Sequence, residues 1–414
     1  MLTAEWFVGV DWAVDAHDVC ILDRQGQVVA RSAVAHTAVG LHAFVESLVA
    51  RAAGDLTRIA IGIEVPRGAL VELCVERGLA VYAINPKQVD RFRDRFTVGG
   101  AKDDPRDAQV IADGLRTDPR AYRHVRLDSP AVLQLREWSR ADDTLREELG
   151  RLTNQLRDVV YRSLPGLLTL CPAADEPWFW TLLELAATPA ALRGLSVRRL
   201  ERLLREHRIR RLTAAVLHEQ LQTPTIYTAP GVVEAVAAHV RLLLPRLAVV
   251  ARQRREAERQ LTQLLEGLDA EPGHQREHSD VAILRSMPGV GIRVAARVLA
   301  EASQPLVERA YHVIRTAMGV APVTRRTGRR HRPTVTMRHA CNVYLRDAGY
   351  HWARTAAQHD PASRAYYQAL RAKGHTHGRA LRSVADRALR IVITLLTRGE
   401  CFDPNHRTAA LAAT

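Results

Sequence analysis

The sequence predicts an α/β domain at the N-terminus, followed by long helices and an all-α C-terminal domain. Three observations predict this order. Within the first 125 residues, short apolar segments alternate with segments of helical periodicity. Further along, residues 133–164 and 235–268 carry apolar side chains every three or four positions, which is typical of long amphipathic helices. The chain has 414 residues, which is too long for one compact core, so two or three domains are expected.

The elements of the first domain are expected in the order β-β-β-α-β-α-β-α. Residues 24–27 have the composition of a hairpin connection, so the first strands should be antiparallel, with crossovers after them. Strands are expected at 6–12, 19–23, 28–34, 58–65 and 81–85, and helices at 38–52, after Gly68 and at 87–96. Another helix should begin at Asp104, which suits an N-cap, with Pro105 in its first turn.

Four carboxylates fall at the ends of these elements. They are Asp11 on the first strand, Glu64 near the end of the fourth, and Asp104 and Asp107 on one face of the later helix. Each also has a structural explanation: a helix cap, a strand-end turn or a surface position before Pro66. Carboxylates that converge at one end of a sheet repel one another unless a hard cation neutralises them, and Mg²⁺ is the usual solution.

Three short motifs carry a resemblance to a known family. They are Gly-Val-Asp at 9–11, Gly-Ile-Glu at 62–64 and Lys-Asp-Asp-Pro-Arg-Asp-Ala at 102–108. The order of elements and acids resembles the RNase H-like (RuvC-like) fold of Holliday-junction resolvases. More closely, the motifs resemble the DEDD-type insertion-sequence transposases, also called bridge-RNA-guided recombinases.

The resemblance implies catalytic and metal-binding roles, with Mg²⁺ as the cofactor, for a tetrad of Asp11, Glu64, Asp104 and Asp107. In the family, Ser or Thr often precedes the third acid, whereas Asp103 stands there in this chain. Asp103 and Asp107 are four apart and can also share a helix face, so the third ligand is open between Asp103 and Asp104.

The long helices in the middle of the chain favour helix pairing, either within one chain or across a dimer. Pro245 is expected to interrupt the second of them. Between them, residues 196–212 carry seven arginines on a leucine-bearing helix. This helix could follow a nucleic-acid backbone, or its arginines could form a solvated face.

Residues 288–291 read Pro-Gly-Val-Gly between two apolar helices and resemble the helix-hairpin-helix of DNA enzymes. Gly289 and Gly291 would let backbone amides approach a phosphate, although any tight helix-helix turn could use this sequence. Pro288 and Arg293 belong to the same expected nucleic-acid contact.

The segment Pro-Val-Thr-Arg-Arg-Thr-Gly-Arg-Arg-His-Arg-Pro, residues 322–333, holds six basic side chains and no acid. The Gly-Val-Ala-Pro at 319–322 and the stretches at 359–361 and 377–387 resemble the C-terminal domain of the same transposases. In that family a Ser-Gly follows, and its serine attacks DNA; Thr327 stands at the matching position, before Gly328. The resemblance therefore implies that Thr327 is the nucleophile.

The nucleic-acid contacts expected around this loop and the tetrad are Lys102, Arg325, Arg326, Gly328, Arg329, Arg330 and Arg332. His375 and His377 are expected to contact phosphate or to pack, because no carboxylate or cysteine completes a metal set at familiar spacing.

The composition agrees with a polyanionic partner. The net charge is +14, and only three of the 59 basic residues are lysines. A GC-rich genome would also favour arginine codons. The five cysteines are scattered, which argues against a disulfide framework or a zinc site and fits a reducing cytosol. The sequence shows no long apolar run and no basic leader, so no membrane partner is expected. A cytoplasmic, nucleoid-associated bacterial protein is expected instead.

These patterns divide the chain into four expected parts. They are an RNase H-like metal-binding domain at 1–125, a helical linker and assembly region at 126–275, a C-terminal transposase domain at 276–405 with the helix-hairpin-helix and the nucleophile loop, and a flexible tail at 406–414.

The resemblance implies a transposase or site-specific recombinase that acts on donor and target DNA, guided by a structured RNA. The two halves of the site lie more than 200 residues apart, so a homodimer or homotetramer is expected. Two alternatives stay open. A hydrolytic junction nuclease needs the carboxylates but no hydroxyl nucleophile. A catalytically impaired nucleic-acid-binding relative would follow from Thr327, whose extra methyl group restricts χ1 and crowds an in-line attack.

Overall fold

The computed structural model describes residues 3–93, 104–223, 226, 228–270, 278–325 and 334–404. The chain divides into two compact units, residues 1–127 and 128–414. No helix in the described ranges is long and apolar enough to cross a membrane.

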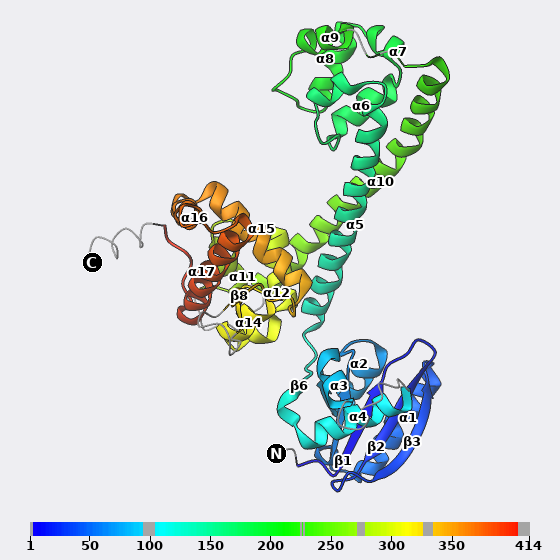
Figure 1. Ribbon diagram of the computed structural model, residues 1–414, viewed down its shortest axis with the longest axis vertical. Helices are drawn as coiled ribbons and strands as arrows, with labels where there is room; N and C mark the ends of the chain where they lie inside the picture. The colour runs from blue at the N-terminus through cyan, green and yellow to red at the C-terminus, as the bar shows by residue number, and fades with distance from the viewer. Residues whose placement is uncertain are drawn as a thin grey trace, which may run out of the picture. The chain divides into compact units, whose positions relative to one another are not determined.

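The N-terminal unit is built on a mixed six-stranded sheet with the strand order β3-β2-β1-β4-β5-β6 (Figure 1). The strands β1 (Trp6–Asp11), β2 (Ala16–Leu22) and β3 (Val28–Ala35) form an antiparallel meander. The strands β4 (Ile59–Ile63) and β5 (Ala80–Ala83) continue from β1 in parallel. A short antiparallel edge strand, β6 (Arg123–His124), completes the sheet and was not predicted.

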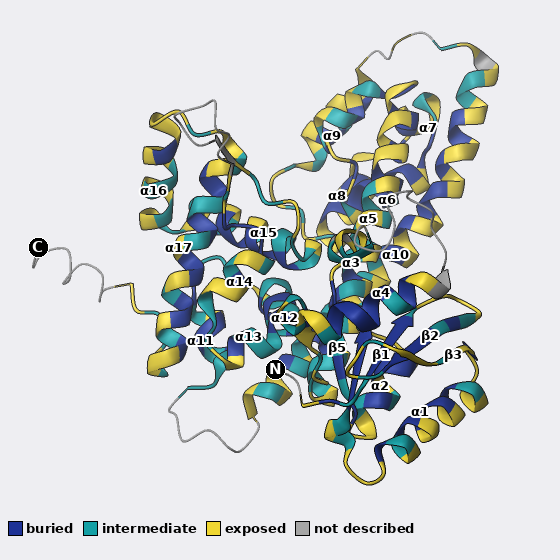
Figure 2. Cartoon of the chain, turned by 60° about the horizontal axis from the view of Figure 1, so that its bottom comes forward, coloured by how far each residue is buried: buried dark blue, intermediate teal, exposed yellow. Residues whose placement is uncertain are grey.

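Four helices cover the two faces of this sheet. The helices α1 (Ala38–Ala52) and α2 (Ala69–Glu76) pack on one face, against side chains that include Val8, Val10 and Ile61. The helices α3 (Pro86–Arg93) and α4 (Asp104–Thr117) pack on the other, against Phe7 and Ala60. Figure 2 shows the central strand β1 buried between the helices, whereas the edge strand β3 is largely exposed. A mixed sheet covered in this way and followed by a helical region is consistent with an RNase H-like fold.

Two long helices pair along their length in the second unit. They are α5 (Pro130–Tyr161) and α10 (Pro230–Ala270), which lie side by side within one chain (Figure 1). The prediction that Pro245 interrupts the second helix was wrong, because α10 runs through it. Buried leucines on both sides of Pro245, Leu243 and Leu247, anchor the helix in the same core as Leu156 of α5, and this packing outweighs the lost backbone hydrogen bond.

Short helices complete the core at one end of this pair. They are α6 (Pro177–Leu185), α7 (Pro189–Arg193), α8 (Val197–Glu206) and α9 (Ala214–Gln222). Their leucines, together with the buried Trp178 and Phe179, form one hydrophobic cluster with the ends of α5 and α10. The arginine-bearing segment predicted from sequence contains α8, whose Leu200, Leu203 and Leu204 face this cluster.

The C-terminal part of this unit is mostly helical. Its helices are α11 (Asp280–Ser286), α12 (Ile292–Glu301), α13 (Ser303–Val307), α14 (Tyr311–Ala317), α15 (Val343–His359), α16 (Pro361–Ala372) and α17 (His377–Arg398). It is not all-α as predicted, because β7 (Val323–Arg325) and β8 (Thr334–Thr336) form a two-stranded antiparallel ribbon. Such short strands leave no alternation that a sequence pattern could reveal.

Candidate active site

The structure places Asp11 and Glu64 at the carboxyl ends of two adjacent parallel strands. Val10 of β1 lies beside Ile63 of β4 in the parallel register, so the next residues along, Asp11 and Glu64, are neighbours at the same edge of the sheet. Side chains alternate along a strand, so Asp11 shares a face with Gly9, and Glu64 shares a face with Gly62. Both acids therefore belong to the face that α4 covers.

Two glycines explain how closely α4 approaches that face. A Cβ atom on Gly9 would lie 1.9 Å from the carbonyl oxygen of Ala108 and 2.6 Å from the amide nitrogen of Ala112. A Cβ on Gly62 would lie 2.9 Å from the Cγ2 atom of Ile111. Glycine is needed at position 9 because the helix backbone occupies the space of a side chain, and at position 62 because the Ile111 side chain does.

The direction of α4 follows from contacts at its other end. Arg116, in the last turn of α4, donates from Nη1 to the carbonyl oxygen of Arg24 at 3.3 Å. Arg24 in turn donates from Nε to the carbonyl oxygen of Ala4 at 3.1 Å, just before β1 begins. The C-terminus of α4 therefore lies near the start of β1, and its N-terminal turn, which contains Asp104 and Asp107, lies towards the end of β1 that carries Asp11.

Asp107 is 4% exposed and forms a two-point ion pair with Arg93, at the end of α3. The Nε atom of Arg93 donates to Oδ1 at 2.7 Å and Nη2 donates to Oδ2 at 2.8 Å. Planar geometry of this kind makes the strongest carboxylate pairs. The buried charge of Asp107 is therefore balanced by a guanidinium within the same unit.

The described carboxylates of the predicted tetrad do not form a set whose oxygens all lie within 4.8 Å of one another. Among the described residues, one group of potential metal ligands meets that distance: Cys171, Asp175 and Glu176. Arg211 donates to both oxygens of Glu176, at 2.6 and 2.9 Å, and burial raises the pKa of the Cys171 thiol. Because the Glu176 carboxylate is already paired with Arg211, a structural role fits this group better than metal binding.

A further acid lies at this sheet edge and was not predicted. Asp18 of β2 lies directly opposite Asp11 in the antiparallel register, so the two residues share a face and a sheet end. Only the hairpin register reveals this, and the first strand of that hairpin was predicted correctly while the second was placed too late, at 19–23. Neighbouring Arg31 of β3 donates to Gln109 of α4 at 2.5 Å, which ties this side of the sheet to the helix.

The structure gives the Pro-Gly-Val-Gly turn between α11 and α12 a packing role. Gly289 has a φ of +83°, and a Cβ on it would lie 2.7 Å from the amide nitrogen of Ala356 in α15. The carbonyl oxygen of Pro288 accepts a hydrogen bond from the indole of Trp352 at 3.0 Å. The turn is thus held against α15, while a Cβ on Gly291 would meet nothing within 4 Å.

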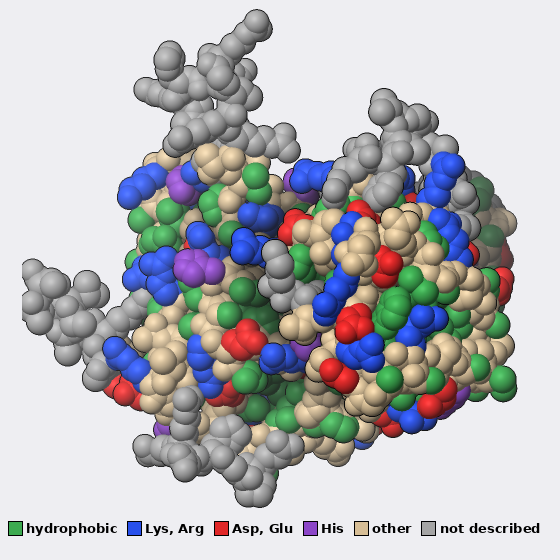
Figure 3. Space-filling model, turned by 90° about the horizontal axis from the view of Figure 1, so that it is seen from below, with side chains coloured by type: hydrophobic (Ala, Val, Ile, Leu, Met, Phe, Trp, Pro, Cys, Tyr) green, Lys and Arg blue, Asp and Glu red, His purple; other side chains and the backbone are tan. Residues whose placement is uncertain are grey.

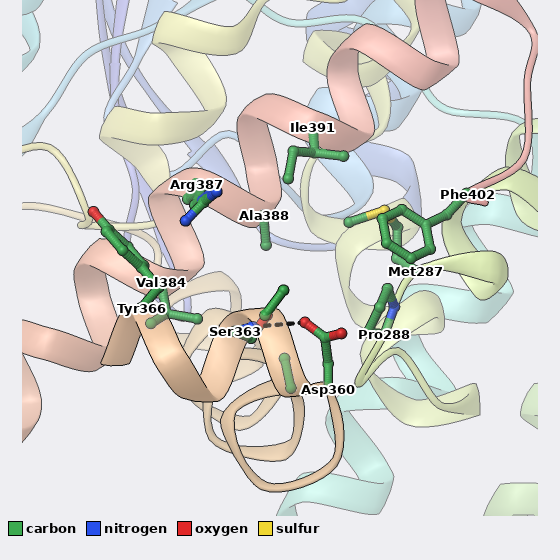
Figure 4. A pocket seen from close by; sticks show the side chains of 12 residues that line it. Met287, Pro288, Asp360, Ser363, Tyr366, Val384, Arg387, Ala388, Ile391 and Phe402 are labelled. Atoms are coloured by element: carbon green, nitrogen blue, oxygen red, sulfur yellow. Dashed lines mark hydrogen bonds between the residues drawn. The ribbon is translucent and has the colours of Figure 1, made fainter. Parts of the chain in front are cut away.

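Arg293, expected at the same nucleic-acid contact, pairs with acids on two other helices. Its Nε donates to Asp142 of α5 at 2.9 Å and its Nη2 to Glu258 of α10 at 3.2 Å. Beside the turn, Met287 and Pro288 border a cavity of about 20 Å³ with α16 and α17 (Figure 4). That volume holds about one water molecule.

The predicted nucleophile loop lies outside the described residues. This applies to Thr327, Gly328 and the neighbouring positions Arg326, Arg329, Arg330 and Arg332, as well as to Lys102 and Asp103. The described part is the ribbon that leads into the loop, in which Val323 lies beside Thr336 and Arg325 beside Thr334. Thr327 follows the end of β7 by two residues.

Two regions of the chain match models of known protein families. Residues 8–165 match a family model described as a transposase, of the DEDD type named after IS110. Residues 281–368 match a second one, described as the transposase IS116/IS110/IS902 family. The IS117 mini-circle protein of Streptomyces coelicolor, assigned by name to the transposases, is 31% identical over 413 residues, which cover 98% of this chain and 97% of that protein. The chain belongs to the IS110 family of transposases.

Other relatives agree with this membership. The protein y4uE of Sinorhizobium fredii, also assigned by name to the transposases, is 43% identical over 209 residues, which cover 50% of this chain and 58% of that protein. A 43.6 kDa protein of insertion element IS110 from Streptomyces coelicolor is 29% identical over 411 residues, 96% of this chain and 95% of that protein. Membership of the family indicates a DNA-transposing enzyme. The first matched region contains all four acids of the predicted tetrad, and the second contains Thr327.

Proposed function

We propose that this protein cuts and rejoins the DNA of an insertion sequence at a RuvC-like carboxylate site with bound Mg²⁺, using Thr327 as a hydroxyl nucleophile. The observation that carries the proposal is the common face of Asp11 and Glu64. Asp11 ends β1 and Glu64 follows β4 on the face that α4 covers, and we expect the N-terminal turn of α4 to bring Asp104 and Asp107 to the same sheet edge.

The donor set fits a hard divalent cation, because carboxylate oxygens on rigid elements are the ligands that Mg²⁺ takes in proteins. Asp11, Glu64 and Asp104 would hold the ion, and Asp107 would share its charge between the ion and Arg93. Bound Mg²⁺ would polarise the scissile phosphate and neutralise developing charge. The strands position Asp11 and Glu64, and Arg93 fixes the orientation of Asp107.

The hydroxyl of Thr327 would supply the nucleophile. Its oxygen attacks phosphorus and forms a phosphoester, while the bond from phosphorus to the leaving strand breaks and that strand's oxygen takes a proton. Arg325, Arg326 and Arg329 would stabilise the negative charge that develops. The methyl group of threonine restricts its rotamers, so we expect slower attack than a serine would give.

Guidance by a structured RNA and assembly as a homodimer or homotetramer complete the proposal. The support for nucleic-acid contact in the middle region is α8, where Arg198, Arg199, Arg202 and Arg205 are exposed and make no ion pair with another described residue. Light scattering with and without RNA and DNA tests the assembly.

The test uses supercoiled donor and target plasmids, the RNA encoded beside the gene, and Mg²⁺. Asp11→Asn should lower recombination at least about 100-fold, which is the usual size of a lost charge-stabilising group. Glu46→Gln, on α1 at the opposite face of the sheet, is the matched control and should recombine like the parent. Parental activity in Asp11→Asn would contradict the carboxylate site.

The nucleophile is tested separately on denaturing gels. The parent should form a covalent protein–DNA adduct, Thr327→Ala should form none, and Thr327→Ser should form more. If Thr327→Ala still cleaves DNA and no adduct forms with the parent, the protein is a hydrolytic nuclease. If neither the parent nor Thr327→Ser cleaves while both bind DNA, the protein is an impaired relative.

A further inference from the structure

A second concave site lies at the base of the β7–β8 ribbon. Its walls come from the segment before β7, the end of β8, the turn between α16 and α17, and the first half of α17. The cavity measures about 210 Å³. A water molecule occupies about 30 Å³ of liquid, so a phosphate group with several waters fits.

Three arginines line this cavity without an acidic partner. Arg379 and Arg382 are three residues apart and share a face of α17, and Arg338 follows β8 by two residues. None of the three makes an ion pair with another described residue. Within the described chain, the one hydrogen bond of the Arg382 side chain is a donation from Nη1 to the sulfur of Met337 at 3.3 Å, and a thioether is a weak acceptor.

The carboxylate in the wall does not balance these charges. Asp386 is the one acid that lines the cavity among the described residues. Arg315 donates to both of its oxygens, from Nε to Oδ1 at 2.8 Å and from Nη2 to Oδ2 at 2.9 Å. The hydroxyl of Tyr311 donates to Oδ1 as well, at 2.8 Å. Asp386 is therefore satisfied by its own partners, and the pocket keeps a surplus of positive charge.

Two buried nitrogen atoms in this wall also lack a partner among the described residues. They are Nε of Arg338 and Nδ1 of His375. A buried polar atom without a hydrogen bond destabilises the folded state, so a ligand with several acceptor oxygens would relieve this cost. Burial lowers the pKa of Arg382, and the charge of Arg379 lowers it further. This direction is expected for a cation without a counter-charge nearby.

We propose that this pocket, at the base of the β7–β8 ribbon, binds a backbone phosphate of the DNA. Arginine offers paired donors that match two phosphate oxygens, and the net charge of +14 favours a polyanion over an isolated carboxylate ligand. The ribbon that frames the pocket leads into the loop at 326–333. The position of the phosphate at the reacting strand rests on the function proposed above, whereas the binding of DNA phosphate in the pocket does not. Figure 3 shows basic (Lys or Arg) and His side chains close together at the left of the view.

The test measures equilibrium binding of the full-length protein to a fluorescein-labelled DNA duplex, in EDTA, over a range of salt concentrations. Arg382→Gln and Arg379→Gln should each weaken binding about 10-fold and reduce the slope of log K against log salt by about 0.9, the value for one lost phosphate contact. Arg398→Gln is the matched control, because it removes the same charge from the same helix about 24 Å further along. It should change affinity less than 2-fold. Circular dichroism shows whether each variant is folded.

The outcomes separate this proposal from the proposed reaction. Thr327→Ala should bind DNA with the parental slope, because no chemistry occurs in EDTA. Loss of strand exchange in Thr327→Ala together with weak binding in Arg382→Gln supports both proposals. Parental slopes for folded Arg379→Gln and Arg382→Gln would overturn the pocket, whatever Thr327 does. An equal loss in Arg398→Gln, or an effect confined to an RNA of the same length, would overturn it too.

Discussion

The Arg93–Asp107 ion pair gives the sharpest test of the N-terminal site. The variant Arg93→Met keeps an unbranched side chain and removes the guanidinium and its charge. The Asp107 side chain is 6% exposed, so its carboxylate would stay buried without a cation. Breaking a buried pair in this way costs about 3–5 kcal/mol, and we expect about 3 kcal/mol, because Arg93 is 22% exposed and water reaches that side.

The reverse change should be less costly. In Asp107→Asn the guanidinium of Arg93 keeps Asp90, whose Oδ1 lies 3.3 Å from Nη1, and it keeps access to water. The double variant Arg93→Met/Asp107→Asn removes both charges, so its loss should be smaller than the sum of the single losses by about 2 kcal/mol. Hydrogen–deuterium exchange of β1 and α4 peptides measures these losses of local stability, without assuming that the whole chain unfolds in one step.

Mg²⁺ then links this ion pair to the proposed function. If Asp107 is a ligand, the ion replaces the charge that Arg93→Met has lost, and it should protect α4 more in that variant than in the parent. At about 100 times its dissociation constant, a ligand adds about 2.7 kcal/mol. Equal protection by Mg²⁺ in Arg93→Met and in the double variant would refute the role of Asp107, and parental exchange in Arg93→Met without Mg²⁺ would refute the dependence on the ion pair.

Three further predictions follow from close contacts and burial. Gly9→Ala should lose recombination activity and expose α4 peptides to exchange, because its Cβ would overlap the carbonyl oxygen of Ala108; parental exchange would contradict the packing. Gly289→Ala should lower the midpoint of thermal unfolding by several degrees, because alanine is strained at a φ of +83° and would meet Ala356; an unchanged midpoint would show that the turn adapts. Burial lowers the pKa of His17 from its usual 6.5, and the charge of His36 lowers it further. The folded state therefore resists protonation, so stability of the N-terminal unit should fall as the pH drops below about 6.5, while His17→Gln should flatten that profile in urea titrations at pH 5 and 7. A parental slope in His17→Gln would assign the effect to other groups.

Sequence patterns predicted the N-terminal unit well because its elements are long and periodic. The helix expected at 38–52 is α1 with the same bounds, since its apolar residues recur at helical spacing and Thr37 caps it through a bond from the amide of Gly40. The short strand β6 and the β7–β8 ribbon were not predicted. Two or three residues carry no period, and their pairing depends on neighbours distant in sequence.

Two glycines were noticed as parts of motifs for one reason, but the fold requires them for another. The Gly-Val-Asp motif was noticed for its acid, yet Gly9 is fixed by the backbone of α4, a contact no local pattern reveals. The Pro-Gly-Val-Gly turn was interpreted as a phosphate contact, yet Gly289 is fixed by α15. In both places the glycine is needed for a helix that lies far away in sequence. A glycine in a motif therefore indicates close approach, and only the fold tells whether the approaching group is protein or ligand.

The net charge of +14 also needs the fold for its interpretation, because the sequence shows the total but not where the unpaired charges lie. The fold distinguishes arginines that pair with acids of the protein from arginines that do not. Arg293 was expected to bind DNA, but it is held by Asp142 and Glu258 between helices. Arg379 and Arg382, which no motif marked as contacts, form no ion pair with an acid of the described chain, because the nearby Asp386 is held by Arg315. Electrostatic attraction for a polyanion comes from charge that the protein leaves unbalanced. The unpaired arginines of α17 are therefore better candidates for phosphate binding than an arginine chosen by its position in a hairpin motif.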